Sequence, residues 1–348
     1  MQGHVDAVQE LVNEGAEVNS RDESGFTPIE RATAENNVDM IRALVELGGD
    51  PNTADGNGGS PAYIAAMQGH ESSIRALAEL GADLNQSKND GATPAYIAAQ
   101  HGQEATIRAL AECGADLCVP NNDGVTPACA AAYSGFGVTV KTLAELGANI
   151  NTPTTDGVTP AHYAARNGNE AIIRILAELG ADINTPTKNG FTPAYIAARH
   201  GQEATIRALA ELGVDLNRPN KTGTTPACIA TQNGHEATIR ALAELGVDIN
   251  RPTKNGASRA FVAAEEGHES SIRVLAELGA DVNTPNNNGA TPAFIAAEQG
   301  HEISIRVLAE LGADINTPNN NGATPVCMAA QQGHESSIRV LAELGADV

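Results

Sequence analysis

The sequence predicts an all-α fold, a solenoid of stacked helix–turn–helix units, from three observations. A turn glycine recurs every 33 residues, most units open with Thr-Pro, and each unit holds two short segments with helical apolar spacing. A period of this length is typical of repeat proteins, in which a unit buries its apolar face only against its neighbours. The turn glycines are Gly25, Gly58, Gly91, Gly124, Gly157, Gly190, Gly223, Gly256, Gly289 and Gly322. We expect a single repeat domain over residues 1–348, with a partial repeat at 1–24 and an incomplete last repeat.

The unit at the middle of the chain shows how its two helices begin and end. Thr192 can cap free backbone N–H groups, and Pro193 suits the first helical position. Gly201 can adopt the left-handed conformation that ends a helix, and Glu203 places negative charge in the first turn of the second helix. Gly213 ends that helix. Small residues on the first helix and large ones on the second make a wedge, so we expect a curved stack with the first helices inside.

Two segments carry the repeat pattern most fully. They are GVTPAHYAA, which starts at Gly157, and GADIN, which starts at Gly180. A unit of this kind, repeated in phase along the whole chain, resembles the ankyrin repeat. The resemblance implies a curved α-solenoid with short hairpin-like loops that binds other proteins and is not an enzyme. The family's histidine is retained only as His162, so the hydrogen bonds of that histidine are not implied in the other units.

The charge balance excludes two classes of partner. The formal net charge is −22, from 21 basic and 43 acidic residues. Nucleic acids and anionic membranes bind clustered cationic surface, so we expect neither nucleic-acid binding nor membrane insertion. The N-terminal segment lacks the apolar core of a signal peptide, and no run approaches the roughly 20 apolar residues of a membrane span. We therefore expect an intracellular, cytoplasmic protein, either a monomeric array or a segment of a longer chain.

Residue types that often hold metals recur with the repeat. The histidines His235, His268, His301 and His334 occupy one position in successive units. Neighbouring units lie about 10 Å apart, whereas zinc ligands lie about 2 Å from one metal. We interpret each histidine as tying its own loop to a helix start. We expect no catalytic residue, no metal and no cofactor, and we interpret the five cysteines as free and mostly buried thiols.

Some of the remaining features allow more than one interpretation. Loop asparagines such as Asn184 resemble the family's sites of asparagine hydroxylation, yet the turn needs the same residues. Glu203, Arg207 and Glu211, four residues apart, predict a solvated charged face on the second helix. One unit has Ser258-Arg259 in place of Thr-Pro, which is either tolerated variation or a local bend.

The surface of the first helices and loop tips is the predicted binding site, because ankyrin proteins, by resemblance, hold their partners there. In the middle units this surface is basic, and it then becomes acidic. Arginine beside aromatic residues is a composition that binding hot spots favour. The predicted contact residues for a protein or peptide partner are Arg166, Lys188, Phe191, Tyr195, Arg199, His200, Arg218, Lys221, Arg251, Lys254, Glu265, Glu266 and Glu298. The alternatives are scattered solvated charges on this surface, and a structural spacer or regulatory arm of a larger multidomain protein.

Overall fold

The computed structural model describes residues 2–347, which form helices joined by loops, without a strand in that range. The helices belong to two compact units. Unit 1 contains the residues up to Ala164 together with Arg174–Asp182, and unit 2 contains Ala165–Ile173 and the residues from Ile183 onward. Over the described range, no helix is long and apolar enough to cross a lipid bilayer.

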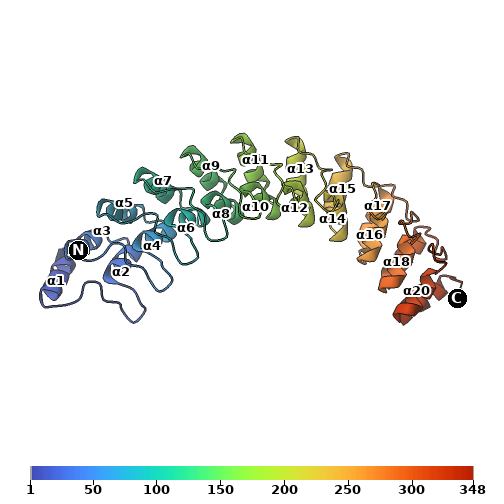
Figure 1. Ribbon diagram of the computed structural model, residues 1–348, viewed down its shortest axis with the longest axis horizontal. Helices are drawn as coiled ribbons and strands as arrows, with labels where there is room; N and C mark the ends of the chain where they lie inside the picture. The colour runs from blue at the N-terminus through green and yellow to red at the C-terminus, as the bar shows by residue number, and fades with distance from the viewer. Residues whose placement is uncertain (1, 348) are drawn as a thin grey trace. The chain divides into compact units, whose positions relative to one another are not determined.

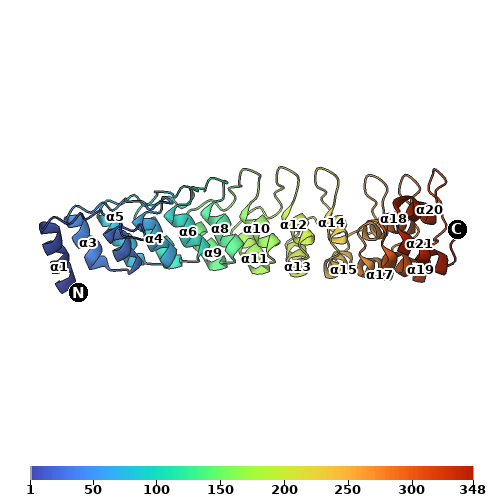
Figure 2. The ribbon, with the colours of Figure 1, turned by 90° about the horizontal axis from the view of Figure 1, so that it is seen from below.

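Each repeat contributes a first and a second helix. In each unit the first helices line one side and the second helices the other (Figure 1), and the loops extend along one edge (Figure 2). The first helices are α2 (Pro28–Ala34), α4 (Pro61–Gln68), α6 (Pro94–Gln100), α8 (Pro127–Ser134), α10 (Pro160–Arg166), α12 (Pro193–Arg199), α14 (Pro226–Gln232), α16 (Arg259–Glu265), α18 (Pro292–Gln299) and α20 (Pro325–Gln332). The second helices are α3 (Val38–Glu46), α5 (Glu71–Glu79), α7 (Glu104–Glu112), α9 (Gly137–Glu145), α11 (Glu170–Glu178), α13 (Glu203–Glu211), α15 (Glu236–Glu244), α17 (Glu269–Glu277), α19 (Glu302–Glu310) and α21 (Glu335–Glu343). The N-terminal partial repeat supplies α1 (Gln2–Asn13).

The first helices begin at the predicted caps. The side chain of Thr192 accepts a hydrogen bond from the Tyr195 backbone nitrogen at 3.2 Å, and Pro193 occupies the first helical position. The predicted left-handed residue at the end of α12 is Gly201, with φ +71°. The repeat without Thr-Pro still has a capped first helix, because the Ser258 side chain accepts a hydrogen bond from the Phe261 backbone nitrogen at 3.1 Å. The exchange of Thr-Pro for Ser-Arg therefore leaves this helix as long as α14.

The core between repeats is aliphatic and rich in alanine. Ile206 and Leu209 on α13 are fully buried, as are Ala197 and Ala198 on α12. Small side chains let first helices of adjacent repeats approach closely, while the larger ones fill the space beside the second helices. The same arrangement recurs in every complete repeat, so the fold places each side chain by its position within the period.

The cysteines depart from the prediction in one respect. All five are free, but only Cys129 and Cys228 are buried, whereas Cys118 and Cys327 are exposed. Cys118 lies in a loop after α7. Cys327 lies on α20, which is followed by its second helix α21 but by no further first helix in the described chain. The exposure of Cys118 and Cys327 depends on where each residue lies in the stack of repeats. The residue type alone does not reveal that position.

Candidate functional site

The predicted contact residues all lie in unit 2, where they form three sets. The first set lies at the C-terminal ends of first helices: Arg166, Arg199, His200, Glu265, Glu266 and Glu298. The second lies in the loops before first helices: Lys188, Phe191, Lys221 and Lys254, with Tyr195 on α12 beside it. The third set lies in the loops that follow the second helices: Arg218 and Arg251. We call these sets together the first-helix face. Its charged residues are exposed, apart from Arg218 and Glu298, which are half-buried.

A basic cluster occupies the ends of α10 and α12. The pKa of His200 is lowered, first by partial burial and then by the positive charges of Arg166 and Arg199 and the nearby His235. This electrostatic effect shows that the cationic groups of two adjacent repeats lie within range of one another. Within residues 2–347, neither Arg166 nor Arg199 forms an ion pair. Their charge is therefore balanced by solvent.

An acidic cluster occupies the same position two repeats later. The pKa of Glu265 is raised, first by burial and then by the negative charges of Glu266 and Glu298. Gln232, at the end of α14, separates the clusters and donates a hydrogen bond from Nε2 to Glu266 Oε1 at 3.2 Å. Along consecutive first helices, this row of side chains therefore changes from positive through neutral to negative.

The loops that carry Lys188 and Lys221 are bonded to each other. The Lys221 backbone nitrogen donates to the Asn189 carbonyl oxygen of the preceding loop at 3.1 Å. A Cβ atom at Gly190 would lie 2.8 Å from that nitrogen, and the φ of Gly190 is +82°, so the close approach requires glycine. Arg218 Nη1 also donates to the Asn184 carbonyl oxygen at 3.2 Å. The loops are thus positioned by backbone contacts between repeats.

The two aromatic residues have different positions. The rings of Phe191 and Tyr195 are stacked, with centroids 4.7 Å apart and planes at 11°. Phe191 is half-buried, but Tyr195 is only 4% exposed. Burial is also the main cause that raises the pKa of Tyr195. Tyr195 therefore supports Phe191 from beneath and offers a partner almost no surface of its own.

The histidine row connects neighbouring repeats, which corrects the expectation that each histidine ties its own loop. His235 Nε2 donates to the Arg199 carbonyl oxygen at 2.9 Å, and His268 Nε2 donates to that of Gln232 at 3.0 Å. His301 bonds the Glu265 carbonyl oxygen in the same way. These bonds hold the ends of the first helices, where the charged clusters lie. Among the described residues, no group of three or more His, Cys, Asp or Glu is placed to hold a metal.

The second helices carry arginines in a different environment. Arg207 pairs with Glu203 at 2.9 Å in its own helix and with Glu244 of the next repeat at 2.7 Å. Further along, Arg273 pairs with Glu310 at 2.6 Å. The solvated face predicted from four-residue spacing is therefore also a series of ion pairs between repeats. We call Arg207, Arg240, Arg273 and Arg306 the outer row, since each pairs with a glutamate of the following repeat.

The two-helix unit, its capped first helix and its bonded loops define a helical-repeat protein. A family model described as "Ankyrin repeats (3 copies)" matches the chain from end to end. The matched residues are 1–55, 47–121, 117–187, 185–253, 213–286 and 260–348. The chain therefore belongs to the ankyrin-repeat family, whose repeats are generally protein–protein interaction modules.

A solved structure supports the same assignment. The human ASB11 ankyrin repeat domain is 27% identical to this chain, with a TM-score of 0.58. The alignment covers 64% of this chain and 99% of the ASB11 domain. None of the curated proteins matches the chain.

Proposed function

We propose that this protein is a non-catalytic scaffold that binds a protein partner through the first-helix face of unit 2. The observation that supports this most directly is the contrast in charge pairing. Outer-row arginines are paired with glutamates, whereas the basic side chains of the first-helix face form no ion pair with any described residue. Exposed charges of one sign that are not used within the fold are available to a partner of opposite sign.

The order of charges suggests the chemistry of that partner. An acidic segment would lie against Arg166, Arg199 and the loop lysines, with Phe191 as the apolar contact beside them. A neutral or basic segment would lie against Glu265, Glu266 and Glu298. Complementary charges in this order would also orient the partner along the repeats, because the reversed orientation places like charges together.

A photo-crosslinking experiment identifies the partner. A photoreactive amino acid at position 199 should link the partner in cells, and the same amino acid at position 207 on the outer row is the control. Recovery of one protein from the first position and not from the second provides a ligand for quantitative binding. Recovery of the same protein from both positions would count against the proposed face.

Charge reversal then tests the face itself. Arg166, Arg199, Arg218 and Arg251, each changed to Glu, should weaken binding of that partner by more than about 100-fold, as loss of several interface charges does. The matched control changes Arg207, Arg240, Arg273 and Arg306 to Glu, which alters the net charge equally. It should change the Kd by less than about threefold, since net charge then acts only at long range. Equal losses in both variants would show that net charge, and not the first-helix face, determines binding.

A further inference from the structure

A pocket lies between the loops that precede α18 and α20, within unit 2. Its volume is about 350 Å³. This is at the low end of the roughly 300–1,000 Å³ of small-ligand pockets, so the pocket holds one side chain rather than a helix. Five asparagines of the two loops line it, together with residues of α16, α18 and α20. We call it the asparagine pocket.

The floor of the asparagine pocket is apolar. Phe261 on α16 is 5% exposed, and Phe294 and Ile295 on α18 are 3% and 6% exposed. Met328 on α20 is half-buried beside them. Because these side chains are almost covered by the fold, they present only a flat apolar surface to an occupant. Such a surface suits the methylene groups of a long side chain.

The walls of the pocket carry amide oxygens that the loops do not use. Asn286 and Asn319 use Oδ1 within their own loops, where each accepts two backbone N–H hydrogen bonds. Asn320 donates from Nδ2 to a carbonyl oxygen of the preceding loop at 3.1 Å, which leaves its Oδ1 as an acceptor. The side-chain amides of Asn288 and Asn321 have no hydrogen bond with any described residue. The walls can therefore accept hydrogen bonds from an occupant.

One carboxylate lines the same pocket without a cation to balance it. Glu298, at the end of α18, is half-buried and forms no ion pair with any described residue. Among the described residues, no lysine, arginine or histidine lines the pocket. After burial and the charge of Glu266, the charge of Glu298 is the next cause that raises the pKa of Glu265. The negative charge of Glu298 therefore acts on a neighbouring acid instead of being neutralised.

Earlier repeats have a lysine where this pocket has an asparagine. The loop position of Lys254 is occupied by Asn320 two repeats later. The side chain of Lys254 lies against Gly223 of the preceding loop, and that of Asn320 lies against Gly289 in the same way. The exchange of lysine for asparagine thus removes a cation of this chain from the edge of the pocket and leaves a hydrogen-bond acceptor there.

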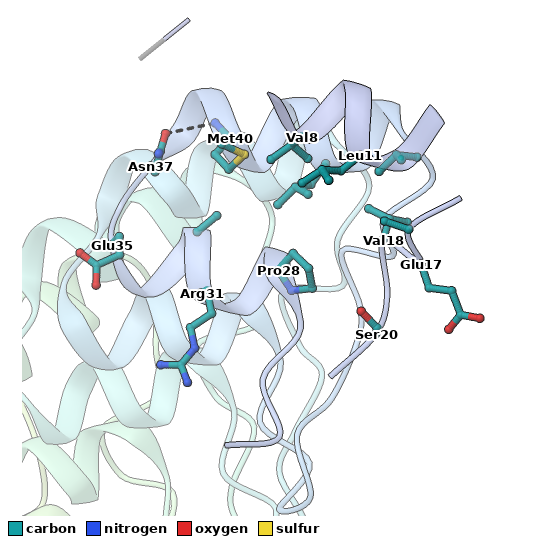
Figure 3. A pocket seen from close by; sticks show the side chains of 14 residues that line it. Val8, Leu11, Glu17, Val18, Ser20, Pro28, Arg31, Glu35, Asn37 and Met40 are labelled. Carbon is teal, nitrogen blue, oxygen red and sulfur yellow. Dashed lines mark hydrogen bonds between the residues drawn. The ribbon is translucent and has the colours of Figure 1, made fainter. Parts of the chain in front are cut away.

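A hollow in unit 1 has a different lining. Figure 3 shows Val8, Leu11 and Met40 around that hollow, while Glu17 and Glu35 are directed away from it. Its interior therefore offers apolar contact without a charged group. The asparagine pocket combines an apolar floor with a carboxylate and amide oxygens, and this combination can select one kind of side chain.

We propose that the asparagine pocket holds a single arginine side chain of the protein partner. This inference rests on the proposed function, because the partner must lie along the first-helix face. The aliphatic stem contacts Phe294, Ile295 and Met328, and the guanidinium lies between Glu298 and the loop amides. Arginine is favoured over lysine, because its five N–H donors are spread over a planar group and reach acceptors on both loops and α18. An ammonium group donates from one atom only.

The first test uses the full chain and a blocked peptide, acetyl-Gly-Arg-Gly-amide. Isotope labelling of the four methionine methyl groups gives a reporter in the pocket, Met328, and two in unit 1, Met40 and Met67. Met328 alone should show a saturable NMR shift. We expect a Kd on the order of 1–10 mM, because one side chain supplies few contacts. No shift at Met328, or an equal shift at Met67, would overturn the proposal.

Two further peptides separate charge from shape. Citrulline in place of arginine keeps the size of the side chain but removes its charge, so its Kd should be about fivefold higher or more. Lysine in place of arginine keeps the charge but loses the planar group, so its Kd should be about threefold higher. Equal binding of the citrulline peptide would overturn the role of Glu298. Equal binding of the lysine peptide would overturn the preference for arginine.

Two protein variants locate the site with residues that other repeats already carry at the same positions. Glu298→Gln removes the carboxylate, and Asn320→Lys places a cation at the edge of the pocket. Each should raise the Kd of the arginine peptide about fivefold or more. The controls change charge equally outside the pocket: Glu302→Gln at the exposed start of α19, and Asn122→Lys at the equivalent loop position in unit 1. Unchanged binding in both pocket variants, or equal losses in the controls, would overturn the site.

The partner recovered by crosslinking shows whether the pocket is used. Glu298→Gln and Asn320→Lys should each weaken its binding about tenfold, as loss of a central interface contact does. Full binding to both pocket variants, together with loss of binding in the four-arginine charge reversal, would overturn this inference and leave the proposed function in place. The opposite pattern would support the pocket and overturn the basic part of the proposed binding face.

Discussion

Two rows of arginines in unit 2 differ in how their charge is balanced. In the outer row, Arg207 and Arg306 bond glutamates of the following repeat at 2.7 Å and 2.5 Å. On the first-helix face, Arg166 and Arg199 are exposed and form no ion pair within the described chain. In both rows, neighbouring arginines are 33 residues apart. The position of the arginine within the repeat therefore decides whether its charge is paired. Arginines on the second helices connect repeats, and arginines on the first helices remain available to other molecules.

By this comparison, arginines on the first helices should be exposed, but Arg259 on α16 is an exception. Its side chain is 2% exposed, and only Nη2 has a partner, the Thr225 hydroxyl oxygen at 3.2 Å. Nε and Nη1 have no hydrogen-bond partner among the described residues, and burial lowers the pKa of the guanidinium. Among the described residues, no carboxylate forms an ion pair with Arg259. Substitution of Arg259 should therefore have the largest effect on the free energy of unfolding.

We predict that Arg259→Pro raises the free energy of unfolding by about 1–3 kcal/mol, because it removes buried unpaired donors and restores proline at the first helical position. Ser258 already has φ −71° and ψ 168°, a conformation that a following proline accepts. Urea denaturation and hydrogen exchange of α14 and α16 measure the gain. The reciprocal change at the equivalent position, Pro226→Arg, should destabilise the chain. A loss of stability in Arg259→Pro would contradict the view that the buried, unpaired guanidinium destabilises the fold.

A smaller effect is expected in the pH dependence of partner binding. The pKa of His200 is lowered in the free protein by burial and by neighbouring positive charge. Acidic groups of a bound partner would raise this pKa, so binding takes up a proton and strengthens as the pH falls. The Kd of the crosslinked partner should decrease by about three- to tenfold between pH 7.5 and pH 5.5, equivalent to a pKa change of up to one unit.

The control for this prediction is His200→Gln, which keeps a polar side chain but does not titrate. Its binding curve should be flat over the same range. Affinity that falls as the pH falls, or an unchanged slope in the variant, would show that His200 does not face acidic groups of the partner.

The smallest effect is expected on the outer row. Arg207→Gln should lower the free energy of unfolding by about 0.5 kcal/mol or less, because the ion pairs with Glu203 and Glu244 are largely exposed to solvent. The difference should disappear in 1 M salt, where the screening length is about 3 Å. Partner affinity should stay within about twofold. A strong loss of binding would remove the distinction between the two rows.

The sequence predicted the local features of the fold because their causes are local. Thr192 and Pro193 start a helix through caps and backbone angles that need no other repeat. The sequence also predicts a partner-binding surface on the first helices and loops, and that surface stays a prediction. The sequence alone could not give contacts whose partners lie one repeat away.

Three residues make contacts that the sequence did not indicate, two of them between repeats. Arg207 was expected to lie on a solvated charged face, but it also bonds Glu244, 37 residues on. His235 was expected to hold its own loop, but it bonds a carbonyl oxygen 36 residues earlier. Tyr195 was expected to contact a partner, but it is buried beneath Phe191. For Arg207 and His235 the register between adjacent repeats decides the contact, and spacing within one repeat carries no information about that register. Tyr195 is buried by packing that includes Phe191 of its own repeat.

The bonds between loop backbones constrain how binding specificity can evolve. Asn287 and Asn320 each donate a backbone hydrogen bond to the preceding loop, at 3.0 Å and 2.9 Å, as Lys221 does. An inserted or deleted residue in one loop would shift its donor and acceptor and break the bonds on both sides. New specificity is therefore expected to arise by exchange of exposed side chains at constant loop length, which agrees with the uninterrupted 33-residue spacing of the turn glycines.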